Sequence, residues 1–430
     1  MIRRLYAGLL CLLSPLVLGF TLWRAWRRPA YGERWWQRFG WIPRSRGPAP
    51  LWVHAVSVGE AIAAIPLVHA LQERFPGHPI LMSTTTPTGA AVVRARLGEG
   101  VTHVYAPYDL PAAVWRFLHR GRPALGIIME TEIWPNLYHA AARRAIPLYL
   151  FNARLSPRSQ RGYQRFHRLL GPALQSLQAI AAQSEADAAA FRALGATQVW
   201  ATGNLKYDLP EQDATRAAGA ALRQPWGDRP VWVFGSTHAG EEELAMAVLR
   251  TLRQRFPQLL LVLAPRHPER CASVAALLRA QGLHAQRRSA GQPAPPEQEV
   301  LLVDTLGELP TFYAAADVVS VGGSFVSKGG HNPLEAAALA KPVIFGPHME
   351  NFRDIARTLL AAGAAVQAAD DNVLAITLAH WLAEPGTARE IGRHGLRVVQ
   401  AQRGALTRSL ALLPERLRTE QSGPMADLQA

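Results

Sequence analysis

The sequence predicts an α/β protein built from two Rossmann-like domains that face a cleft. Its 430 residues exceed one ordinary core and fit two domains of under about two hundred residues each. Hydrophobic residues make up 49% of the chain and charged residues 18%, so large cores can be buried. Short β-rich runs alternate with amphipathic stretches, and the alternation stops once and then restarts. Strands that alternate with helices form a mostly parallel sheet with covered faces.

Buried strands are expected in the first half, separated by helical segments rich in Ala, Leu and Arg. They lie at residues 51–55, 80–83, 103–105, 125–129, 148–151, 179–183 and 199–201. Over residues 206–229 the pattern breaks into polar residues that include Pro210, Pro225 and Gly227. Because proline and glycine interrupt regular structure, we expect a linker there.

The alternation restarts after the linker. Further strands are expected at residues 231–234, 259–263, 300–303, 318–321 and 343–345. Helical character continues through residues 373–417, and the tail after Glu420 is expected to be disordered. In open α/β sheets ligands bind beyond the carboxyl ends of the strands, so the motifs that directly follow strands are the candidate functional sites.

The charge of the chain favours anionic partners. Basic residues outnumber acidic ones by 46 to 32, a net charge of +14, which suits nucleic acid, acidic lipid or a phosphorylated substrate without choosing among them. The two cysteines, Cys11 and Cys271, lie far apart in the sequence and indicate no disulfide framework or cysteine metal cluster. We therefore expect a reducing compartment.

Residues 5–23 are uncharged and predict a membrane-anchor helix. Such a helix is about 28 Å long at roughly 1.5 Å per residue, which just spans a hydrocarbon core. Two arginines precede the stretch and more follow it closely, so the positive-inside rule places the bulk of the chain in the cytoplasm. A cleaved signal peptide is the competing interpretation, but the sequence WRAWRR that follows has no small-x-small cleavage site.

Residues 31–41 (YGERWWQRFGW) interleave arginines with aromatic side chains. This mixture suits an anionic headgroup interface. The aromatic side chains can equally pack on the domain that follows, and the two interpretations are compatible.

Two polar turns follow strands near the start of the first half. The motif HAVSVGE at residues 54–60 places Glu60 at a helix N-terminus, where its carboxylate is either a general base or only a helix cap. The motif STTTPTG at residues 83–89 can bind a sugar or phosphate, and its composition is also common at helix caps.

Three further motifs lie at later strand ends of this half. In METEIWPN at residues 129–136, Glu130 and Glu132 follow a hydrophobic strand, where carboxylates can have altered pKa values. The alternative is that one of them caps the helix after Pro135. The others are FNARLS at residues 151–156 and GNLK at residues 203–206, which holds Lys206, one of three lysines in the chain.

The second half carries polar loops in the same position. After strands come GSTHAGE at residues 235–241, APRHPER at 264–270 and DTLGEL at 304–309. The richest is the glycine-rich VGGSFVSKGGHNPLE at residues 321–335. With Asn332 as cap and Pro333 as first helical residue, its helix terminus predicts an anion site, and Glu335 can accept hydrogen bonds from ribose hydroxyls.

Several enzyme classes lack their signatures here. The sequence contains no Walker A loop and no Gly-x-Gly-x-x-Gly, which disfavours NTPases and dinucleotide enzymes. Gly-x-Ser-x-Gly, His-Glu-x-x-His and Asp-x-Asp are also missing, which disfavours α/β-hydrolases, zincins and metal-dependent glycosyltransferases. The histidines show no ligand spacing.

Five of the motifs together closely resemble those of the 3-deoxy-D-manno-octulosonic acid (Kdo) transferases of lipopolysaccharide assembly. They are HAVSVGE at residues 54–60, METEIWPN at 129–136, GNLK at 203–206, APRH at 264–267 and GGHNPLE at 329–335. The resemblance covers nearly the whole chain, including the anchor. It implies the GT-B glycosyltransferase fold, CMP-Kdo as donor, the lipid A precursor lipid IVA as acceptor, and no metal or other cofactor.

The resemblance also implies roles for single residues. The family's general base falls on Glu60, which would take the proton of the acceptor hydroxyl as that oxygen attacks and inverts the anomeric carbon of Kdo. The family's transition-state stabilisers fall on Glu130 and Lys206. The residues expected to bind CMP-Kdo are Arg266, His267, Gly307, Glu308, Leu309, Asn332, Pro333, Leu334 and Glu335.

The implied domain organisation has four parts. They are a membrane anchor at residues 1–28, an acceptor-binding domain at 29–215, a donor-binding domain at 216–418 and a flexible tail at 419–430. The anchor would cross the bacterial inner membrane once, with the catalytic domains on its cytoplasmic side beside anionic lipids. Nucleic acid is not an expected partner.

Two other interpretations remain. The nearest is another membrane-associated GT-B glycosyltransferase that uses a UDP-sugar and a polyprenyl-linked acceptor. The second is a basic nucleic-acid-binding or membrane-scaffold protein, for which no helix-turn-helix, RNA-recognition or zinc pattern is present.

Overall fold

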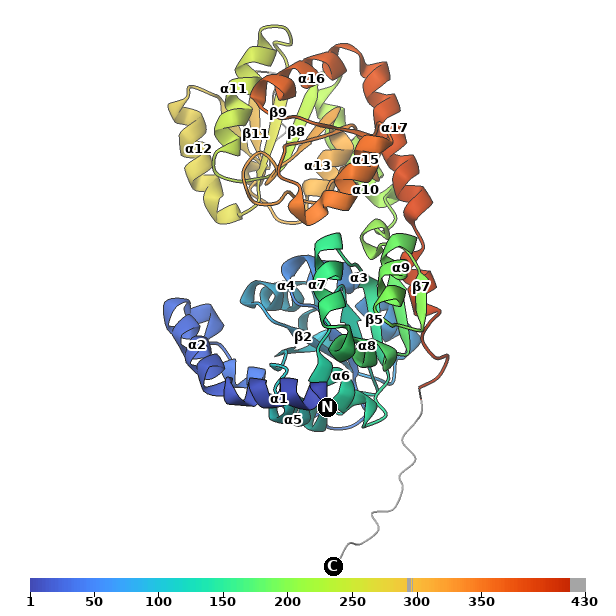
Figure 1. Cartoon of the computed structure of the whole chain (residues 1–430). Coiled ribbons are helices and arrows are strands. Elements are labelled where there is room, and N and C mark those ends of the chain that lie inside the picture. The colour runs from blue at the N-terminus through green and yellow to red at the C-terminus, as the bar shows by residue number, and fades with distance from the viewer. Residues whose placement is uncertain (292–294, 296, 418–430) are drawn as a thin grey trace, which may run out of the picture. The chain divides into compact units, whose positions relative to one another are not determined.

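The computed structural model describes residues 1–291, 295 and 297–417 (Figure 1). They form two compact units: the first holds residues 1–208 together with 403–417, and the second holds Leu209–Gln402. Each unit has one seven-stranded sheet in which all neighbouring strands are parallel. The predicted α/β class with two Rossmann-like domains is confirmed. The tail expected at residues 419–430 lies outside the described residues.

The order of the strands in the sheet of the first unit reverses at its centre. Its strands are β1 (Leu51–His54), β2 (Ile80–Thr84), β3 (Val101–Tyr105), β4 (Leu125–Met129), β5 (Leu148–Ala153), β6 (Ala179–Ala182) and β7 (Val199–Ala201). Their order is β3-β2-β1-β4-β5-β6-β7, so successive strands run outward from β1 on one side and from β4 on the other. The crevice beyond the carboxyl ends of β1 and β4 is therefore the expected ligand position.

Helices cover both faces of this sheet. They are α3 (Val58–Arg74), α4 (Pro87–Leu97), α5 (Pro111–Gly121), α6 (Pro135–Ala142), α7 (Pro157–Arg165), α8 (His167–Gln175), α9 (Glu185–Ala193) and α18 (Ala405–Leu410), with 3₁₀ turns η1 (Pro29–Tyr31), η2 (Trp35–Phe39), η3 (Gly98–Gly100) and η4 (Leu205–Tyr207). Alternate side chains of β1 enter opposite cores, Trp52 on one face and Leu51 and Val53 on the other. Burial on both faces explains why the strands appear in the sequence as continuous apolar runs.

The second unit repeats the arrangement. Its strands are β8 (Val231–Thr237), β9 (Leu260–Pro265), β10 (Ala285–Arg287), β11 (Val300–Leu302), β12 (Val318–Val321), β13 (Val343–Phe345) and β14 (Ala365–Gln367). The order β10-β11-β9-β8-β12-β13-β14 reverses between β8 and β12. The sequence did not predict β10 and β14, because both are three-residue edge strands with polar or partly exposed positions.

The helices of the second unit include one where a linker was expected. They are α10 (Asp213–Arg223), α11 (Glu241–Arg253), α12 (Cys271–Ala280), α13 (Leu309–Ala315), α14 (Leu334–Ala337), α15 (Arg353–Ala361), α16 (Asp371–Ala383) and α17 (Pro385–Gln402), with η5 (Gln224–Trp226), η6 (Pro268–Arg270), η7 (Arg288–Ala290) and η8 (Glu350–Phe352). A Cβ on Gly219 of α10 would lie 2.3 Å from the Cβ of Ala314 in α13. The missing side chain thus lets α10 pack closely, and residues 206–229 are not a simple linker.

The chain returns to the first unit after α17. The donor-binding domain was expected to run from residue 216 to 418, but the units divide at Asp208 and Leu209, and residues 403–417 join the first unit. The carboxylate of Asp208 accepts hydrogen bonds from the backbone nitrogens of Gly404 (2.6 Å) and Leu406 (2.5 Å). Ala405 and Leu413 are buried in the core beside β1. An amphipathic helix pattern cannot reveal which of two cores it will cover.

The expected single anchor helix is broken in two. Helices α1 (Ile2–Leu12) and α2 (Ser14–Arg27) meet at Leu13 with a bend of 50°. Pro15 lacks the N–H that a continuous helix requires, which accounts for the break. Within residues 1–291, 295 and 297–417, no single helix has both the length and the apolar character to cross a membrane, although the bent pair satisfies both criteria together.

Candidate active site

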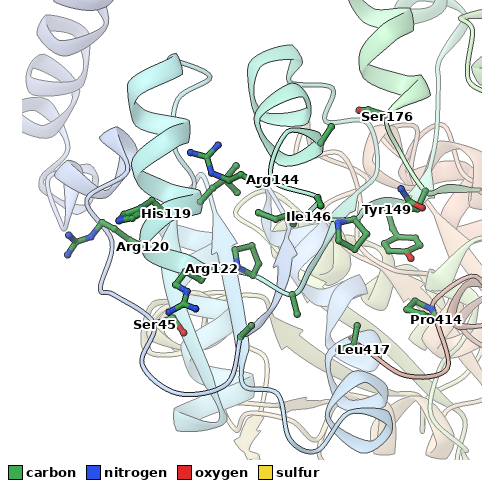
Figure 2. Close-up of a pocket in the computed structure, with 18 of the residues that line it drawn as sticks. Ser45, His119, Arg120, Arg122, Arg144, Ile146, Tyr149, Ser176, Pro414 and Leu417 are labelled. Carbon is green, nitrogen blue, oxygen red and sulfur yellow. The ribbon is translucent and has the colours of Figure 1, made fainter. Parts of the chain in front are cut away.

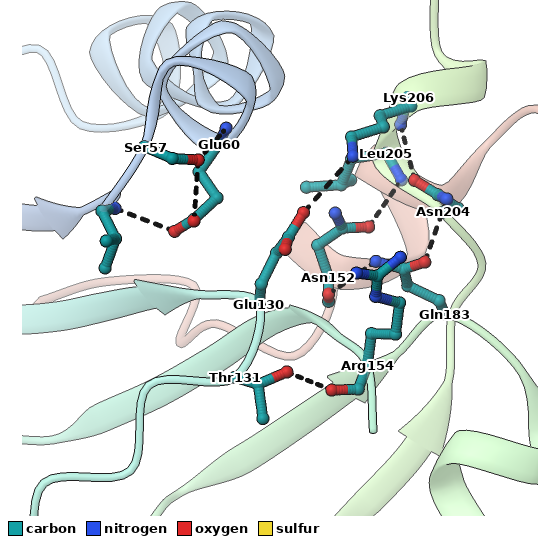
Figure 3. Close-up of polar contacts among 11 residues, drawn as sticks. Ser57, Glu60, Glu130, Thr131, Asn152, Arg154, Gln183, Asn204, Leu205 and Lys206 are labelled. Carbon is teal, nitrogen blue, oxygen red and sulfur yellow. Dashed lines mark hydrogen bonds and ion pairs between the residues drawn. The ribbon is translucent and has the colours of Figure 1, made fainter. Parts of the chain in front are cut away.

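Glu60 lies in the first turn of α3, directly beyond the carboxyl end of β1. Ser57 caps the helix by accepting from the backbone nitrogen of Glu60 at 3.4 Å, and its hydroxyl donates to Glu60 Oε1 at 2.9 Å. Glu60 Oε2 accepts from the backbone nitrogen of Val56 at 2.8 Å (Figure 3). The side chain thus belongs to the helix cap, and the cap holds its carboxylate in one orientation.

The surroundings of Glu60 also favour a role as a base. Burial and, to a lesser extent, the carboxylate of Glu130 raise its pKa to about 7, although the hydrogen bonds from Val56 and Ser57 lower it. An exposed cap at a helix N-terminus would have a lowered pKa instead. A carboxylate that titrates near neutral pH can accept a proton from a hydroxyl and release it again.

Glu130 follows β4 in an unusual backbone conformation. Its φ is +59°, in the left-handed region that costs a residue with a Cβ of order 1 kcal/mol. Its backbone nitrogen donates to the carbonyl of Phe151 on β5 at 2.9 Å, which continues the strand pairing by one residue. The turn directs the carboxylate toward Lys206, whose Nζ lies 3.4 Å from Glu130 Oε1 (Figure 3).

Polar side chains from β5 and β6 hold the segment that carries Lys206. Asn152, fully buried and with φ +56°, accepts from the backbone nitrogen of Leu205 through Oδ1 at 3.0 Å. Asn204 accepts from the backbone nitrogen of Lys206 at 3.0 Å and donates to Gln183 at 3.0 Å. The sequence placed Asn152 and Lys206 at strand ends but did not single out Gln183, whose only signal is its position directly after β6.

Neither glutamate of the motif caps the next helix. Asp109 does so, because its carboxylate accepts from the backbone nitrogens of Asn136 (3.1 Å) and Leu137 (2.8 Å) in α6. Glu132 accepts from the indole nitrogen of Trp134 at 2.7 Å, and burial raises the pKa of its carboxyl group. Glu130 is therefore the carboxylate of this motif that joins Lys206 in the first unit.

The loop after β2 adjoins the loop that holds Glu60. Thr86 caps α4 by accepting from the backbone nitrogen of Gly89 at 3.1 Å, as the composition suggested. Thr85 donates to the carbonyl of Val56 through its backbone nitrogen (3.3 Å) and its hydroxyl (3.0 Å). The two loops therefore form one edge beyond β1 and β2.

In the second unit, three histidines gather beyond β8, β9 and β12. His238 and His331 are stacked, with ring centroids 5.2 Å apart and Nε2 atoms 2.9 Å apart, and His267 meets His238 edge-on at 5.6 Å. Burial and the positive charge of Arg266 lower the pKa of His331 to about 3. Burial, His267 and Lys328 lower that of His238 to about 4, so these two rings are neutral and offer hydrogen bonds at the switch between β8 and β12.

Glu241, absent from the sequence-derived site, ties these loops together. Its carboxylate is fully buried and accepts from the backbone nitrogens of His238 (2.9 Å), Gly323 (2.8 Å) and Phe325 (3.0 Å). The loops after β8 and β12 are therefore held against each other by one side chain. Its position in the sequence resembles an ordinary helix start, which is why the pattern did not distinguish it.

Replacing Glu241 with Gln should lower the free energy of unfolding by about 1–3 kcal/mol, because an amide leaves at least one buried backbone N–H without an acceptor. Glu243→Gln is the matched control, since Glu243 lies on the same helix turn and is exposed. Urea unfolding of both variants checks this. Equal unfolding free energies would contradict the bridging role of Glu241.

The other predicted donor residues lie at strand ends of the same sheet. Arg266 directly follows β9, and its backbone nitrogen donates to the carbonyl of Thr237 at 2.9 Å. Glu308 precedes α13 and pairs with Arg288 at 2.9 Å, a hydrogen bond that lowers the pKa of its carboxyl group. The Glu308 carboxylate is thus already occupied, whereas Gly307 borders open space.

The helix expected after the glycine-rich loop is very short. Pro333 occupies the cap position rather than the first helical position, and α14 spans four residues. Asn332 Oδ1 accepts from the backbone nitrogen of Leu334 at 3.1 Å. A helix of one turn has little dipole, so this helix terminus alone does not make the predicted anion site.

A cavity of 1410 Å³ lies at the opposite edge of the first sheet. It is bordered by residues that precede β1, β4 and β5, and Figure 2 shows Arg120, Arg122 and Arg144 around it. No carboxylate is among its lining residues. Because Glu60 and Glu130 follow the carboxyl ends of β1 and β4, this hollow is separate from the catalytic candidates.

Comparison with known proteins identifies close relatives of the whole chain. Residues 33–209 match the family described as 3-deoxy-D-manno-octulosonic-acid transferase (kdotransferase). The 3-deoxy-D-manno-octulosonic acid transferase of Haemophilus influenzae is 39% identical over 417 residues, which cover 96% of this chain and 98% of that protein. The protein of the same name from Bordetella pertussis is 42% identical over 431 residues, covering 96% and 99%.

A solved structure of low sequence identity agrees with the fold. The UDP-GlcNAc 2-epimerase of Neisseria meningitidis, bound to UDP-GlcNAc, is 14% identical with a TM-score of 0.52, over 84% of this chain and 99% of that one. Such a likeness concerns the fold and not the activity. The predicted GT-B fold is confirmed.

Proposed function

The chain belongs to the 3-deoxy-D-manno-octulosonic acid (Kdo) transferase family, and from this premise we propose that it transfers Kdo from CMP-Kdo to lipid IVA with inversion at the anomeric carbon. The observation that carries the proposal is Glu60, a buried carboxylate with a pKa of about 7 beside Glu130. An inverting transfer to a hydroxyl requires one base of this kind.

In the proposed reaction, Glu60 accepts the proton of the acceptor hydroxyl while that oxygen forms a bond to the anomeric carbon of Kdo. The bond from this carbon to the phosphate oxygen of CMP breaks, and its electron pair leaves with CMP. Attack on the face opposite the leaving group inverts the carbon. Glu130 and Lys206 stabilise the charges that develop in an oxocarbenium-like transition state.

The donor is assigned to the second unit by its chemistry. CMP-Kdo carries a phosphate and a carboxylate, and Arg266, His267 and Lys328 lie in loops at the carboxyl edge of that sheet. The neutral pair His238 and His331 adds hydrogen-bonding groups. Because Arg266 and Lys328 supply positive charge to the leaving phosphate, the proposal needs no metal ion.

Attachment to the cytoplasmic face of the bacterial inner membrane is part of the proposal. Large apolar side chains of α1 and α2 are exposed, namely Leu5, Leu9, Leu12, Leu16, Phe20, Trp23 and Trp26. Arginines flank them, which suits anionic headgroups. Both helices also make polar contacts with the rest of the first unit, through Tyr6 with Asp109 and Thr21 with Tyr108. We therefore propose that they lie along the membrane surface instead of crossing it.

Thermal protection by free nucleotides tests the donor class. If the donor is CMP-Kdo, CMP should raise the melting temperature at concentrations where UDP does not, because only a ligand of the folded state stabilises it. Protection by UDP alone would instead favour the glycosyltransferase that uses a UDP-sugar.

The pH dependence of transfer should follow Glu60. Below about 7, kcat/KM should fall about tenfold per pH unit, because protonated Glu60 cannot act as a base. In the folded state the carboxyl group of Glu60 keeps its proton up to about pH 7, whereas the ordinary pKa of a glutamate is 4.5. The contribution of Glu60 to stability therefore decreases between pH 4.5 and 7 and is constant above that range. A flat rate profile from pH 5.5 to 7 would contradict the assignment.

A further inference from the structure

A groove separates α2 from the body of the first unit. Leu16, Val17 and Phe20 of α2 form its apolar wall together with Leu13, which precedes this helix. Arg38 and Thr85 are among the residues opposite. Its volume of 530 Å³ is in the range of small-ligand sites. An apolar wall facing polar groups suits a ligand with a hydrocarbon part and a polar part.

Polar contacts fix this wall to the unit. The hydroxyl of Thr21 on α2, a buried residue, lies 2.8 Å from that of Tyr108. On α1, Tyr6 donates to the carboxylate of Asp109 at 3.0 Å. Hydrogen bonds at these specific positions are not needed by a helix that serves only as a membrane tether. The anchor segment is therefore built into the unit as the side of a groove.

Arg38 places an uncompensated charge at this groove. Arg38 is buried, with 6% of its surface exposed. One nitrogen of its guanidinium group donates to the carbonyl of Thr85 at 2.8 Å, and the group lies 4.6 Å from the ring centre of Tyr105. Among the described residues no carboxylate pairs with it. Buried charges in proteins are normally paired. An anionic group of a ligand would supply the missing partner.

The groove leads to the loop that holds the proposed base. Thr85, which lines the groove, donates to the carbonyl of Val56, and the backbone nitrogen of Val56 donates to Glu60 Oε2. Val56 thus connects Thr85, in the lining of the groove, to the carboxylate of Glu60. The polar side of the groove, opposite α2, is therefore the side that contacts the loop of Glu60.

We propose that this groove is the lipid subsite for the acceptor: one acyl chain of a phosphorylated glycolipid packs against α2, and a phosphate of the same lipid pairs with Arg38. The inference rests on the proposed function for the class of acceptor. It makes the N-terminal segment part of the substrate site and gives the buried arginine a counter-ion.

Filling the groove tests the acyl-chain part. Val17→Trp should raise KM for lipid IVA at least about tenfold with little change in kcat, because the chain loses buried apolar contact. Leu18→Trp is the matched control, since the exposed Leu18 is next in sequence but outside the groove lining. Leu16→Trp, at an exposed position of the same wall, gives a second filled groove if Val17→Trp does not fold.

Removing the charge tests the phosphate part. Arg38→Gln should lower kcat/KM at least about tenfold for lipid IVA and leave it unchanged for lipid IVA from which both phosphates have been removed. Equal losses with both acceptors would overturn the pairing with phosphate.

The two levels of the proposal fail in different ways. If the unaltered full chain makes no Kdo product from CMP-Kdo and lipid IVA, the proposed function fails. If it makes product and the groove-filling variants, still protected by CMP against heating, show the KM of Leu18→Trp, only the groove inference fails.

Discussion

Replacing Glu60 with Gln should lower the rate of Kdo transfer by at least about 10²–10⁴-fold, the usual contribution of a general base. The glutamine can keep the cap, because its oxygen can accept from Val56 and its amide can donate to the hydroxyl of Ser57. It cannot accept a proton from the acceptor. Single-turnover kinetics with saturating CMP-Kdo and lipid IVA measure the loss.

Stability separates this effect from misfolding. Because burial raises the pKa of Glu60, the charged form destabilises the fold above pH 7, and the uncharged Gln should keep or raise the melting temperature at pH 8. Glu73→Gln on the exposed side of α3 is the matched control and should change neither rate nor stability. Turnover by Glu60→Gln close to that of the Glu73 variant would remove Glu60 as the base.

Replacing Lys206 with Met should give the second large loss, about 10²–10³-fold in kcat, the cost typical of removing one group that stabilises transition-state charge. Met is an unbranched side chain one atom shorter than Lys, and it removes the charge 3.4 Å from Glu130. If Lys206 acts on developing charge, KM for lipid IVA should change much less than kcat.

Lys341→Met is the control for Lys206→Met, because Lys341 is also a mostly buried lysine but donates to the carbonyl of Ala316 in the second unit. Lys341→Met should leave the kcat of the folded fraction of the variant unchanged. A loss in kcat as large as that of Lys206→Met would mean that the effect of Lys206 is general and not catalytic.

The central strands were predictable because burial on both faces makes their sequences continuous apolar runs. Both faces of β1, β4, β8 and β9 are buried along most of their length, so their sequences are apolar except at the carboxyl ends of β1 (His54) and β8 (Ser236 and Thr237). Edge strands β10 and β14 lack this signal. The return of residues 403–417 to the first unit depends on tertiary contacts such as Asp208 with Gly404, which no local pattern contains.

The candidate site was predictable to a similar extent. Motifs at strand ends pointed to Glu60, Glu130 and Lys206, and β1 and β4 are neighbours in the sheet. Lys206 follows the edge strand β7, and its approach to Glu130 depends on Asn152, which holds the segment that carries it. The sequence could not show that Asp109 caps α6, nor that Glu130 forms an ion pair with Lys206. Nor could it identify Glu241, because its three partners come from backbone groups on two distant loops.

Direct assay of transfer tests the central claim. The full chain, solubilised in detergent, is incubated with lipid IVA and CMP-Kdo generated in situ, and products are weighed by mass spectrometry beside Glu60→Gln. The account predicts lipid IVA heavier by one or more Kdo units, with release of CMP, from the unaltered chain and at least about a hundredfold slower product formation from the variant. No product from the unaltered chain, in protein that UDP and not CMP protects against heating, would contradict it.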